Sequence, residues 1–171
     1  MINLRQLSKM SKGTQFFKTN INEKLMFSNH VIPPSHIFAH SKYSFAFVNI
    51  SPVVIGHVLI STKRTSVYKF NDLREEELTD IFKLTQYVGK ALDLRYGTDS
   101  KNISIQDGSD AGQSVKHLHI HLLPRRHKDF DCIDGIYDKL HKHDKQERTL
   151  QSSLEMEIDA TEMKKFMEIC K

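Results

Sequence analysis

Four short stretches of the chain have the apolar patterns of β-strands. Residues 44–50 alternate and are rich in Phe and Val, and residues 115–123 alternate cleanly, which is typical of half-buried strands. A loop ending at Gly56 joins the first two stretches, so we expect them to pair antiparallel. Pro124 should end the last strand, because proline cannot donate to a ladder. The predicted strands are 44–50, 57–61, 102–106 and 115–123.

A longer stretch, residues 72–96, has helical periodicity. Asp72 and Glu75 have the spacing of a capping box. Glutamates crowd the first turn, where the helix dipole favours anions, and Gly97 is suited to end the helix. Steps of three and four residues give one apolar face, whose members are Leu78, Ile81, Phe82, Thr85, Val88 and Leu92.

A second helical pattern covers residues 159–170. Asp159 and Glu162 are expected to cap it, and its apolar stripe consists of Met163, Phe166, Met167 and Cys170. Together the elements predict an α+β fold. We expect an antiparallel sheet of about five strands, a long helix over one face and a C-terminal helix.

Composition places these elements in one domain. The chain has 171 residues, of which 39% are hydrophobic and 27% charged, and this size suits a single core. No apolar run approaches the roughly 18 residues that a membrane-spanning helix needs, so no membrane partner is expected. Cys132 and Cys170 form no CxxC pair and are expected to be free thiols in a reducing cytosol.

Positive charge is concentrated at the start of the chain. The net charge is +4, and residues 1–25 account for it, with five basic residues against Glu23. The high pI therefore gives no reason to expect nucleic-acid binding by the body. We expect residues 1–25 to be a basic, flexible extension, 26–148 a domain body and 149–171 a C-terminal helical segment. A cytoplasmic location is expected; a nuclear one and mitochondrial targeting by the extension stay open, although a single Arg argues against the latter.

The most informative stretch is residues 112–123. His117, His119 and His121 alternate with apolar residues, and alternate side chains of a strand share one face. We therefore expect the three imidazoles on one face, with neighbouring rings starting about 7 Å apart. The residues expected to face the core are Leu118, Ile120 and Leu122.

Three interpretations of this pattern compete. A structural one is disfavoured, because histidine is not a preferred strand former. In a metal site, histidines at i and i+2 could share a zinc ion, but the third starts about 13 Å from the first. Lys116, Arg125 and Arg126 bracket the strand, and no acidic residue lies between Gln113 and Lys128. A cation would therefore meet repulsion.

Phosphate chemistry explains the pattern best. The glycine-bearing loop before the strand can offer backbone N–H groups to anionic oxygens, and Gln113 and Ser114 add neutral donors. Histidine is a good nucleophile at neutral pH, because its pKa is about 6.5. A phosphohistidine intermediate would split one displacement into two. The residues thus favour phosphoryl or nucleotidyl transfer.

At this stretch the sequence resembles the histidine triad (HIT) family, whose motif is three alternating histidines separated by apolar residues. The surrounding chain is similar to the fragile histidine triad branch, the dinucleoside polyphosphate hydrolases, over residues 27–148. This resemblance implies a HIT-like form of the α+β fold. The matching stretches are 27–30, 44–49, 56–59, 104–108, 111–125, 136–137 and 142–145.

The resemblance also implies roles for individual residues. His119 would attack the α-phosphorus of diadenosine triphosphate and become adenylylated, releasing ADP, and water would then release AMP. His121 would contact phosphate, His117 would hold the arrangement and His57 would orient the triad. The other implied substrate contacts are His30, Asn49 (to the ribose), Gln106, Gly112, Gln113, Ser114 and Val115.

The same resemblance implies a homodimer whose central helices pair. Phe82 and Val88 are either part of that contact or face their own sheet. No carboxylate cluster suggests a permanent metal site, so a divalent cation, Mg or Mn, is expected only with the polyphosphate. Two alternatives stay open: an adenosine phosphoramidase with the same nucleophile, and a nucleotide-bound signalling module with slow product release.

Overall fold

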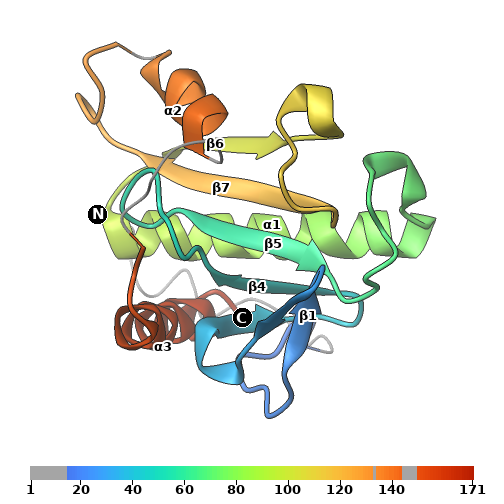
Figure 1. The fold of residues 1–171 in the computed structure, drawn as a ribbon. Helices are drawn as coiled ribbons and strands as arrows, with labels where there is room; N and C mark the ends of the chain where they lie inside the picture. The colour runs from blue at the N-terminus through green and yellow to red at the C-terminus, as the bar shows by residue number, and fades with distance from the viewer. Residues whose placement is uncertain (1–14, 133, 144–149) are drawn as a thin grey trace.

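Five antiparallel strands form the central sheet, in the spatial order β3-β4-β5-β7-β6 (Figure 1). The computed structural model describes residues 15–132, 134–143 and 150–171. Residues 1–14 of the expected extension and part of the 142–145 match lie outside this description. The strands are β3 (Ile37–His40), β4 (Ser44–Val48), β5 (Val58–Thr62), β6 (Ser100–Ile105) and β7 (His119–Arg125).

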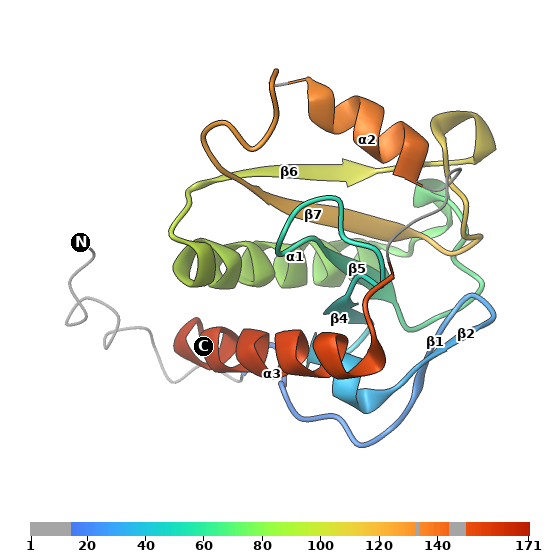
Figure 2. The same cartoon turned by 60° about the vertical axis from the view of Figure 1, so that its left-hand side comes forward.

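Two helices cover one face of the sheet. Helix α1 (Glu75–Tyr96) and helix α3 (Ser153–Ile169) lie side by side there (Figure 2). Their apolar residues and alternate residues of the central strands form one buried cluster, which includes Ala46, Ile60, Leu84, Ile120 and Met163. The expected α+β fold, with a long helix and a C-terminal helix on an antiparallel sheet, is confirmed.

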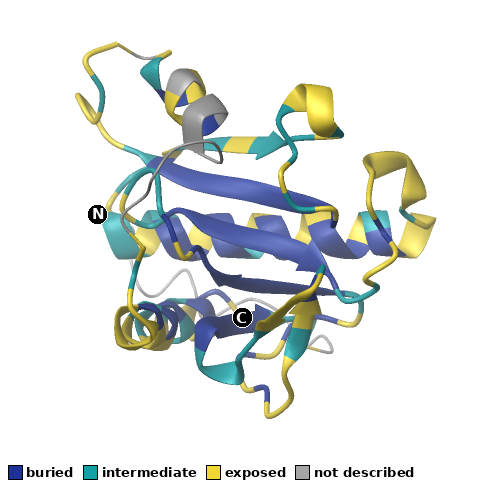
Figure 3. Cartoon of the chain, viewed as in Figure 1, coloured by how far each residue is buried: buried dark blue, intermediate teal, exposed yellow. Residues whose placement is uncertain are grey.

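On the opposite face, the described part of the chain places a hairpin at one end and a helix at the other. A hairpin of β1 (Leu25–Phe27) and β2 (His30–Ile32) packs on one end through Phe27. Helix α2 (Gly135–His143) packs on the other through Ile136 and Leu140. The central strands between them are buried, whereas edge strand β6 is partly exposed (Figure 3).

Helix α1 begins at Glu75, and Asp72 does not cap it. Arg74 is the N-cap residue, and its N–H donates to the Glu77 carboxylate at 3.0 Å. Asp72 ends a short 3-10 helix, η3 (Phe70–Asp72), where it accepts from the N–H groups of Tyr68 and Lys69. The Asp72 carboxylate therefore already accepts hydrogen bonds from residues before α1 and does not cap that helix. Gly97 ends α1 with φ 62°, as expected.

Helix α3 begins at Ser153, six residues before the predicted start at Asp159. Ser152 is the N-cap, and its hydroxyl oxygen accepts from the Glu155 N–H. Asp159 lies inside the helix and forms an ion pair of 2.6 Å with Arg95 of α1. The residue taken for a cap thus joins the two helices.

Strand β7 differs from the prediction at both ends. It begins at His119, because Leu118 donates its N–H to Val67 instead of to a neighbouring strand. It continues through Pro124, which lies opposite Lys101 of β6. Since pairing with β5 ends at Leu122, one side of β7 has no partner strand at Pro124, and the missing N–H is tolerated.

Residues 15–25 are part of the body, so the predicted boundary at residue 26 is too late. Phe17 is 2% exposed and its ring centroid lies 5.0 Å from that of Tyr87 on α1. Lys18 and His40 exchange backbone hydrogen bonds, which extends the sheet by one bridge. The scattered apolar residues of this segment therefore fill the core beside α1.

Phe82 and Val88 do not form one stripe. Val88 is fully buried under the sheet, whereas Phe82 is 42% exposed.

Two further short 3-10 helices lie in the connections: η2 (Pro34–His36) and η4 (Ser109–Ala111). None of the helices in the described part of the chain is long and apolar enough to cross a membrane.

Replacing Phe17 tests whether the N-terminal segment stabilises the fold. Phe17→Ala should lower the free energy of unfolding by about 3 kcal/mol or more, because it leaves a cavity in the core. Urea denaturation followed by circular dichroism measures this. Leu154→Ala, at a site that is 66% exposed, should have little effect. Equal stabilities of the Phe17 variant and the wild type would contradict the packing described here.

Candidate active site

The three alternating histidines lie together on the sheet face opposite α1 and α3, between the hairpin and α2. His119 and His121 are on β7, and His117 precedes the strand. All three are buried, with exposed fractions of 0 to 4%. The ring centroids of His119 and His121 are 4.8 Å apart, closer than the separation expected at the backbone, since the two side chains lean toward each other. His117 does not lie on the regular strand that the sequence predicted.

The apolar residues between the histidines face the other way. Ile120 and Leu122 belong to the core cluster under α1, and Leu118 is 1% exposed. Ser61 of β5 lies opposite His119, and Leu59 lies opposite His121. Strand β6 pairs with the other edge of β7, so the two strand histidines stand on a strand that has a neighbour on each side.

The proton positions on His57 and His121 follow from the backbone. The Val53 N–H lies 3.2 Å from His57 Nδ1, and because an N–H can only donate, this nitrogen is an acceptor. The proton of neutral His57 is therefore on Nε2, which lies 2.9 Å from His121 Nδ1. His121 accepts that hydrogen bond, so its own proton is on Nε2. His57 thus holds His121 and leaves its Nε2 as a donor; the catalytic role that the resemblance implies for His57 stays a prediction.

His119 is held with its other nitrogen ready to react. Its Nδ1 lies 2.8 Å from the main-chain oxygen of His117, and a carbonyl can only accept. The proton is therefore on Nδ1, and Nε2 carries the lone pair. The Phe27 ring meets His119 edge-on, with centroids 5.2 Å apart, and restricts the rotation of the imidazole.

His117 is held in one neutral form. Its Nδ1 accepts from the Ser28 N–H at 2.9 Å, and its Nε2 lies 3.0 Å from Thr62 Oγ1. Burial, and repulsion from His119 whenever that ring is protonated, lower the pKa of His117 to about 4. His117 therefore stays neutral near pH 7 and cannot act as an acid or base in turnover. Its main-chain oxygen holds His119.

Asn49 lies beside His57, directly after β4. Its side chain is buried, and its Nδ2 lies 3.3 Å from His57 Nδ1. Its Oδ1 accepts from the Ser51 N–H at 3.0 Å. In this arrangement Asn49 supports the turn that carries Val53, whose N–H fixes His57. The contact with a ribose stays a prediction.

The loop before the triad is folded on itself. The N–H groups of Ala111, Gly112 and Gln113 donate to carbonyls of Gly108 and Ser109. These three N–H groups are therefore not directed at an anion, contrary to the expectation from the loop's glycines. A side chain on Gly112 would come within 2.8 Å of the Gln106 amide nitrogen, and φ of 90° also favours glycine there.

Gln113 joins this loop to the segment before α1. Its Oε1 accepts from the Gly108 N–H, and its Nε2 donates to the Tyr68 carbonyl, both at 2.9 Å. Ser114 next to it is exposed, and Val115 packs against the apolar cluster under the hairpin. A phosphate contact by Gln113 would require its amide to leave Tyr68.

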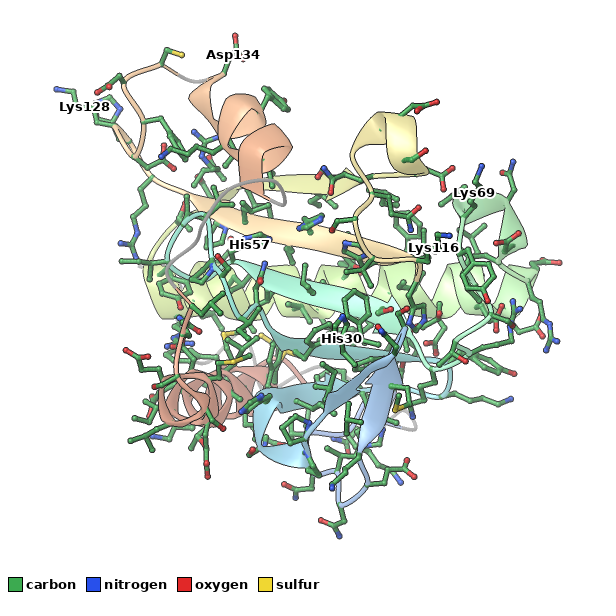
Figure 4. All side chains as sticks on the ribbon, viewed as in Figure 1. His30, His57, Lys69, Lys116, Lys128 and Asp134 are labelled. Carbon is green, nitrogen blue, oxygen red and sulfur yellow. The ribbon has the colours of Figure 1, made fainter. Side chains whose placement is uncertain are left out.

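The hairpin brings His30 to the same side of the sheet. His30 begins β2 and is exposed, and Figure 4 shows it at the hairpin, with His57 above it near β5 and β7. The turn of the hairpin also carries Phe27 and Ser28, which contact the triad. The structure thus gathers the triad, His57 and Asn49 tightly, and places the predicted loop and His30 around them.

Three contributors were missed in the sequence. Phe27, Ser28 and Thr62 touch the triad from the hairpin and from the end of β5. Phe27 and Ser28 belong to a stretch that resembles the family, and this was the available signal. Thr62 had none. Within the described residues, no group of three or more His, Cys, Asp or Glu side chains is arranged to hold a metal ion.

The arrangement suits covalent catalysis at phosphorus. A neutral, oriented imidazole offers Nε2 as nucleophile, and a neighbouring imidazole offers an Nε2–H donor for the charge that develops on oxygen. The HIT domain family matches residues 31–128. This chain belongs to the histidine triad family.

Relatives place the chain in the fragile histidine triad branch of the family. It is 41% identical over 163 residues to the nitrilase and fragile histidine triad fusion protein NitFhit of Caenorhabditis elegans, covering 91% of this chain and 37% of that protein. It is 39% identical over 142 residues to the bis(5'-adenosyl)-triphosphatase of Dictyostelium discoideum, covering 83% of this chain and 92% of that protein.

A solved structure supports the same placement. The Plasmodium falciparum diadenosine triphosphate hydrolase, in complex with cyclomarin A, has a TM-score of 0.72 and 28% identity, covering 96% of this chain and 94% of that chain. This chain spans about a third of the length of NitFhit. The resemblance of the triad and its surroundings to the branch is therefore confirmed.

Acid should destabilise this histidine triad protein through His117. Its pKa is about 4 when folded and about 6.5 in an unfolded chain, so the unfolded chain binds more protons between these values. The stabilisation is complete above about pH 6.5 and is lost as pH falls toward 4, by about 3 kcal/mol. Urea unfolding at pH 7 and pH 4 measures it. His117→Asn should lose less over this interval, and equal losses would refute the assignment.

Proposed function

We propose that this protein hydrolyses diadenosine triphosphate to AMP and ADP. Relatives of similar length carry that activity in their names, bis(5'-adenosyl)-triphosphatase and diadenosine triphosphate hydrolase. The observation that carries the proposal is the directional hydrogen bonding of the triad. It presents a lone pair on His119 Nε2 and a donor on His121 Nε2 from the same strand face.

The first step is an in-line displacement at the α-phosphorus. The lone pair of His119 Nε2 forms the new N–P bond, the bond from phosphorus to the bridging oxygen breaks, and ADP leaves with that electron pair. The Nδ1 proton, already donated to the His117 carbonyl, stays in place while positive charge develops on the ring. The carbonyl dipole stabilises this charge.

The second step returns the enzyme to its starting state. Water attacks the adenylyl phosphorus, the N–P bond breaks, and its electron pair returns to His119 Nε2. AMP leaves with the water oxygen, and the proton that this water loses passes to solvent. His121 Nε2–H donates to a phosphoryl oxygen in both steps. The hydrogen bond from His57 keeps that donor in the required tautomer.

Other predicted contacts complete the substrate site in this proposal. Asn49 and Gln106 are assigned to the nucleoside, with His30 on the hairpin. The loop residues Gly112, Gln113, Ser114 and Val115 are assigned to the phosphates. Because Gln113 bonds Tyr68 in the structure, substrate binding has to exchange that partner. A divalent cation, Mg²⁺ or Mn²⁺, is proposed to arrive with the polyphosphate.

An adenosine phosphoramidase would use the same nucleophile, so the triad does not separate the two reactions. The names of the relatives favour the triphosphatase. A signalling module that acts through its bound nucleotide is compatible with the same chemistry if product release is slow. Comparing turnover of diadenosine triphosphate and an adenosine phosphoramidate on one preparation distinguishes the two substrates.

We also propose a homodimer formed through α1 and the edge strand β6. Phe82 on α1 is 42% exposed and Ile103 on β6 is 54% exposed, and both line a groove beside Gly89. An edge strand with an exposed apolar residue is a surface on which a second strand can pair. A second copy of the chain offers the same helix and strand, as a two-fold contact requires.

Replacing the nucleophile tests the reaction. His119→Asn should lower kcat for diadenosine triphosphate by at least about 10³-fold, because no N–P bond can form, while nucleotide binding persists. His127→Asn, at an exposed position outside the triad, should leave kcat unchanged. Chromatographic detection of AMP and ADP gives the rates. An active His119 variant would rule out this mechanism.

The same experiment can locate the intermediate. Wild-type protein mixed with diadenosine triphosphate and quenched should carry one AMP on the peptide that contains His119. Mass spectrometry under non-acidic conditions detects this adduct, because phosphoramidate bonds are acid-labile. An adduct on His117 or His121 would contradict the assignment of the nucleophile.

The dimer is tested at the exposed aromatic of α1. Phe82→Glu should change the mass measured by light scattering from that of two chains to that of one 19.9 kDa chain, because a charge is placed in an apolar contact. Leu154→Glu, on the exposed side of α3, should remain dimeric. A monomeric wild type would disprove the proposed dimer.

A further inference from the structure

The His117 ring is part of a chain of hydrogen bonds with one direction. The Ser28 N–H donates to Nδ1, so the ring proton is on Nε2 and points at Thr62 Oγ1, 3.0 Å away. The Thr62 hydroxyl donates in turn to the Arg64 carbonyl at 3.1 Å. The lone pairs of the Thr62 hydroxyl oxygen can therefore accept from His117. Every donor in this series of three hydrogen bonds meets an acceptor.

Both partners of the ring come from outside the triad strand. Ser28 lies in the turn of the β1–β2 hairpin, and Thr62 is the last residue of β5 (Figure 1); both contact the His117 ring. Ser28 has φ 55°, a left-handed conformation that is uncommon for a residue with a side chain. Thr62 and His117 are both fully buried, so water cannot replace a lost partner.

The position of the ring matters because the same residue holds the nucleophile. The main-chain oxygen of His117 accepts from His119 Nδ1 at 2.8 Å. The His117 ring also stacks on Phe27, which meets His119 edge-on. A displaced His117 ring would therefore disturb His119 through two contacts, the carbonyl and Phe27.

We propose that Thr62 is a positioning residue for the nucleophile: its hydroxyl holds the His117 ring, and His117 in turn holds His119. This inference rests on the proposed function, in which His119 attacks phosphorus. The side chain required at position 62 is a hydroxyl that accepts from a buried imidazole N–H. Thr62 does not touch the reacting atoms.

The test compares Thr62→Val with Thr62→Ser. Valine has nearly the shape of threonine but no hydroxyl, so the buried Nε2–H of His117 loses that acceptor and keeps only the main-chain oxygens of Thr62 and Arg64. We expect kcat for diadenosine triphosphate to fall about 10-fold or more with little change in KM, as for other residues that orient a reacting group through a second one. Serine restores the hydroxyl and should restore kcat to within a few-fold of the wild type.

A matched control separates this effect from the general cost of removing a buried hydroxyl. Thr85 is buried on α1, and its hydroxyl donates to the Ile81 carbonyl, away from the triad. Thr85→Val should leave kcat unchanged. Circular dichroism and thermal unfolding establish that each variant is folded before its rate is compared.

Nuclear magnetic resonance of protein labelled with ¹⁵N-histidine tests the hydrogen bond itself. In the wild type, His117 should show a slowly exchanging downfield proton on Nε2. That resonance should move upfield or exchange rapidly in Thr62→Val, and persist in Thr62→Ser and Thr85→Val. An unchanged resonance in Thr62→Val would disprove the bond, and an altered resonance with wild-type kcat would show a structural role alone. An inactive wild type would overturn the proposed function, and the resonance would still decide whether Thr62 holds His117.

Discussion

Burying four imidazoles without charging them is the constraint under which this site is built. His57, His117, His119 and His121 are all nearly inaccessible to water, and burial disfavours the charged form of an imidazole. Groups that can act in only one way fix the ring protons of three of them: main-chain N–H groups donate to His117 and His57, and a main-chain carbonyl accepts from His119. Because that carbonyl holds the proton of His119 on Nδ1, the reactive lone pair of His119 is on Nε2.

The sequence predicted the parts of the fold that periodicity encodes. Strands β4 and β5, the body of α1 and its glycine end follow from alternation, helical spacing and one special residue. The wrong details depend on partners distant in sequence. Asp72 is taken by η3 before it can cap α1, and Pro124 stays in β7 because β5 has already ended. The spacing of residues in the sequence reveals neither the hydrogen-bond partners of Asp72 nor the point at which β5 ends beside β7.

The active site was also predicted only in part from the sequence. The alternation of the triad predicted a nucleotidyl-transfer centre, and the resemblance supplied His57 as an orienting residue. The groups that set the tautomers are mostly backbone atoms, such as the N–H groups of Ser28 and Val53. A backbone N–H is present at every residue except proline, so its role leaves no trace in the sequence. Thr62 resembles any other threonine of a strand until its neighbour across the fold is known.

The meeting of the two ends of the chain has a consequence for how the protein is made. Phe17 packs in the same cluster as Met163 and Met167 of α3, and the Thr19 hydroxyl bonds Glu168. During synthesis the segment that carries Phe17 is made long before α3, and its apolar side chains are covered only when α3 is present. Most of the sheet can pair earlier, but its helix-covered face closes only after residue 167 has emerged. The helix-covered face therefore depends on contacts between residues far apart in the chain, and contacts of that kind form slowly in folding.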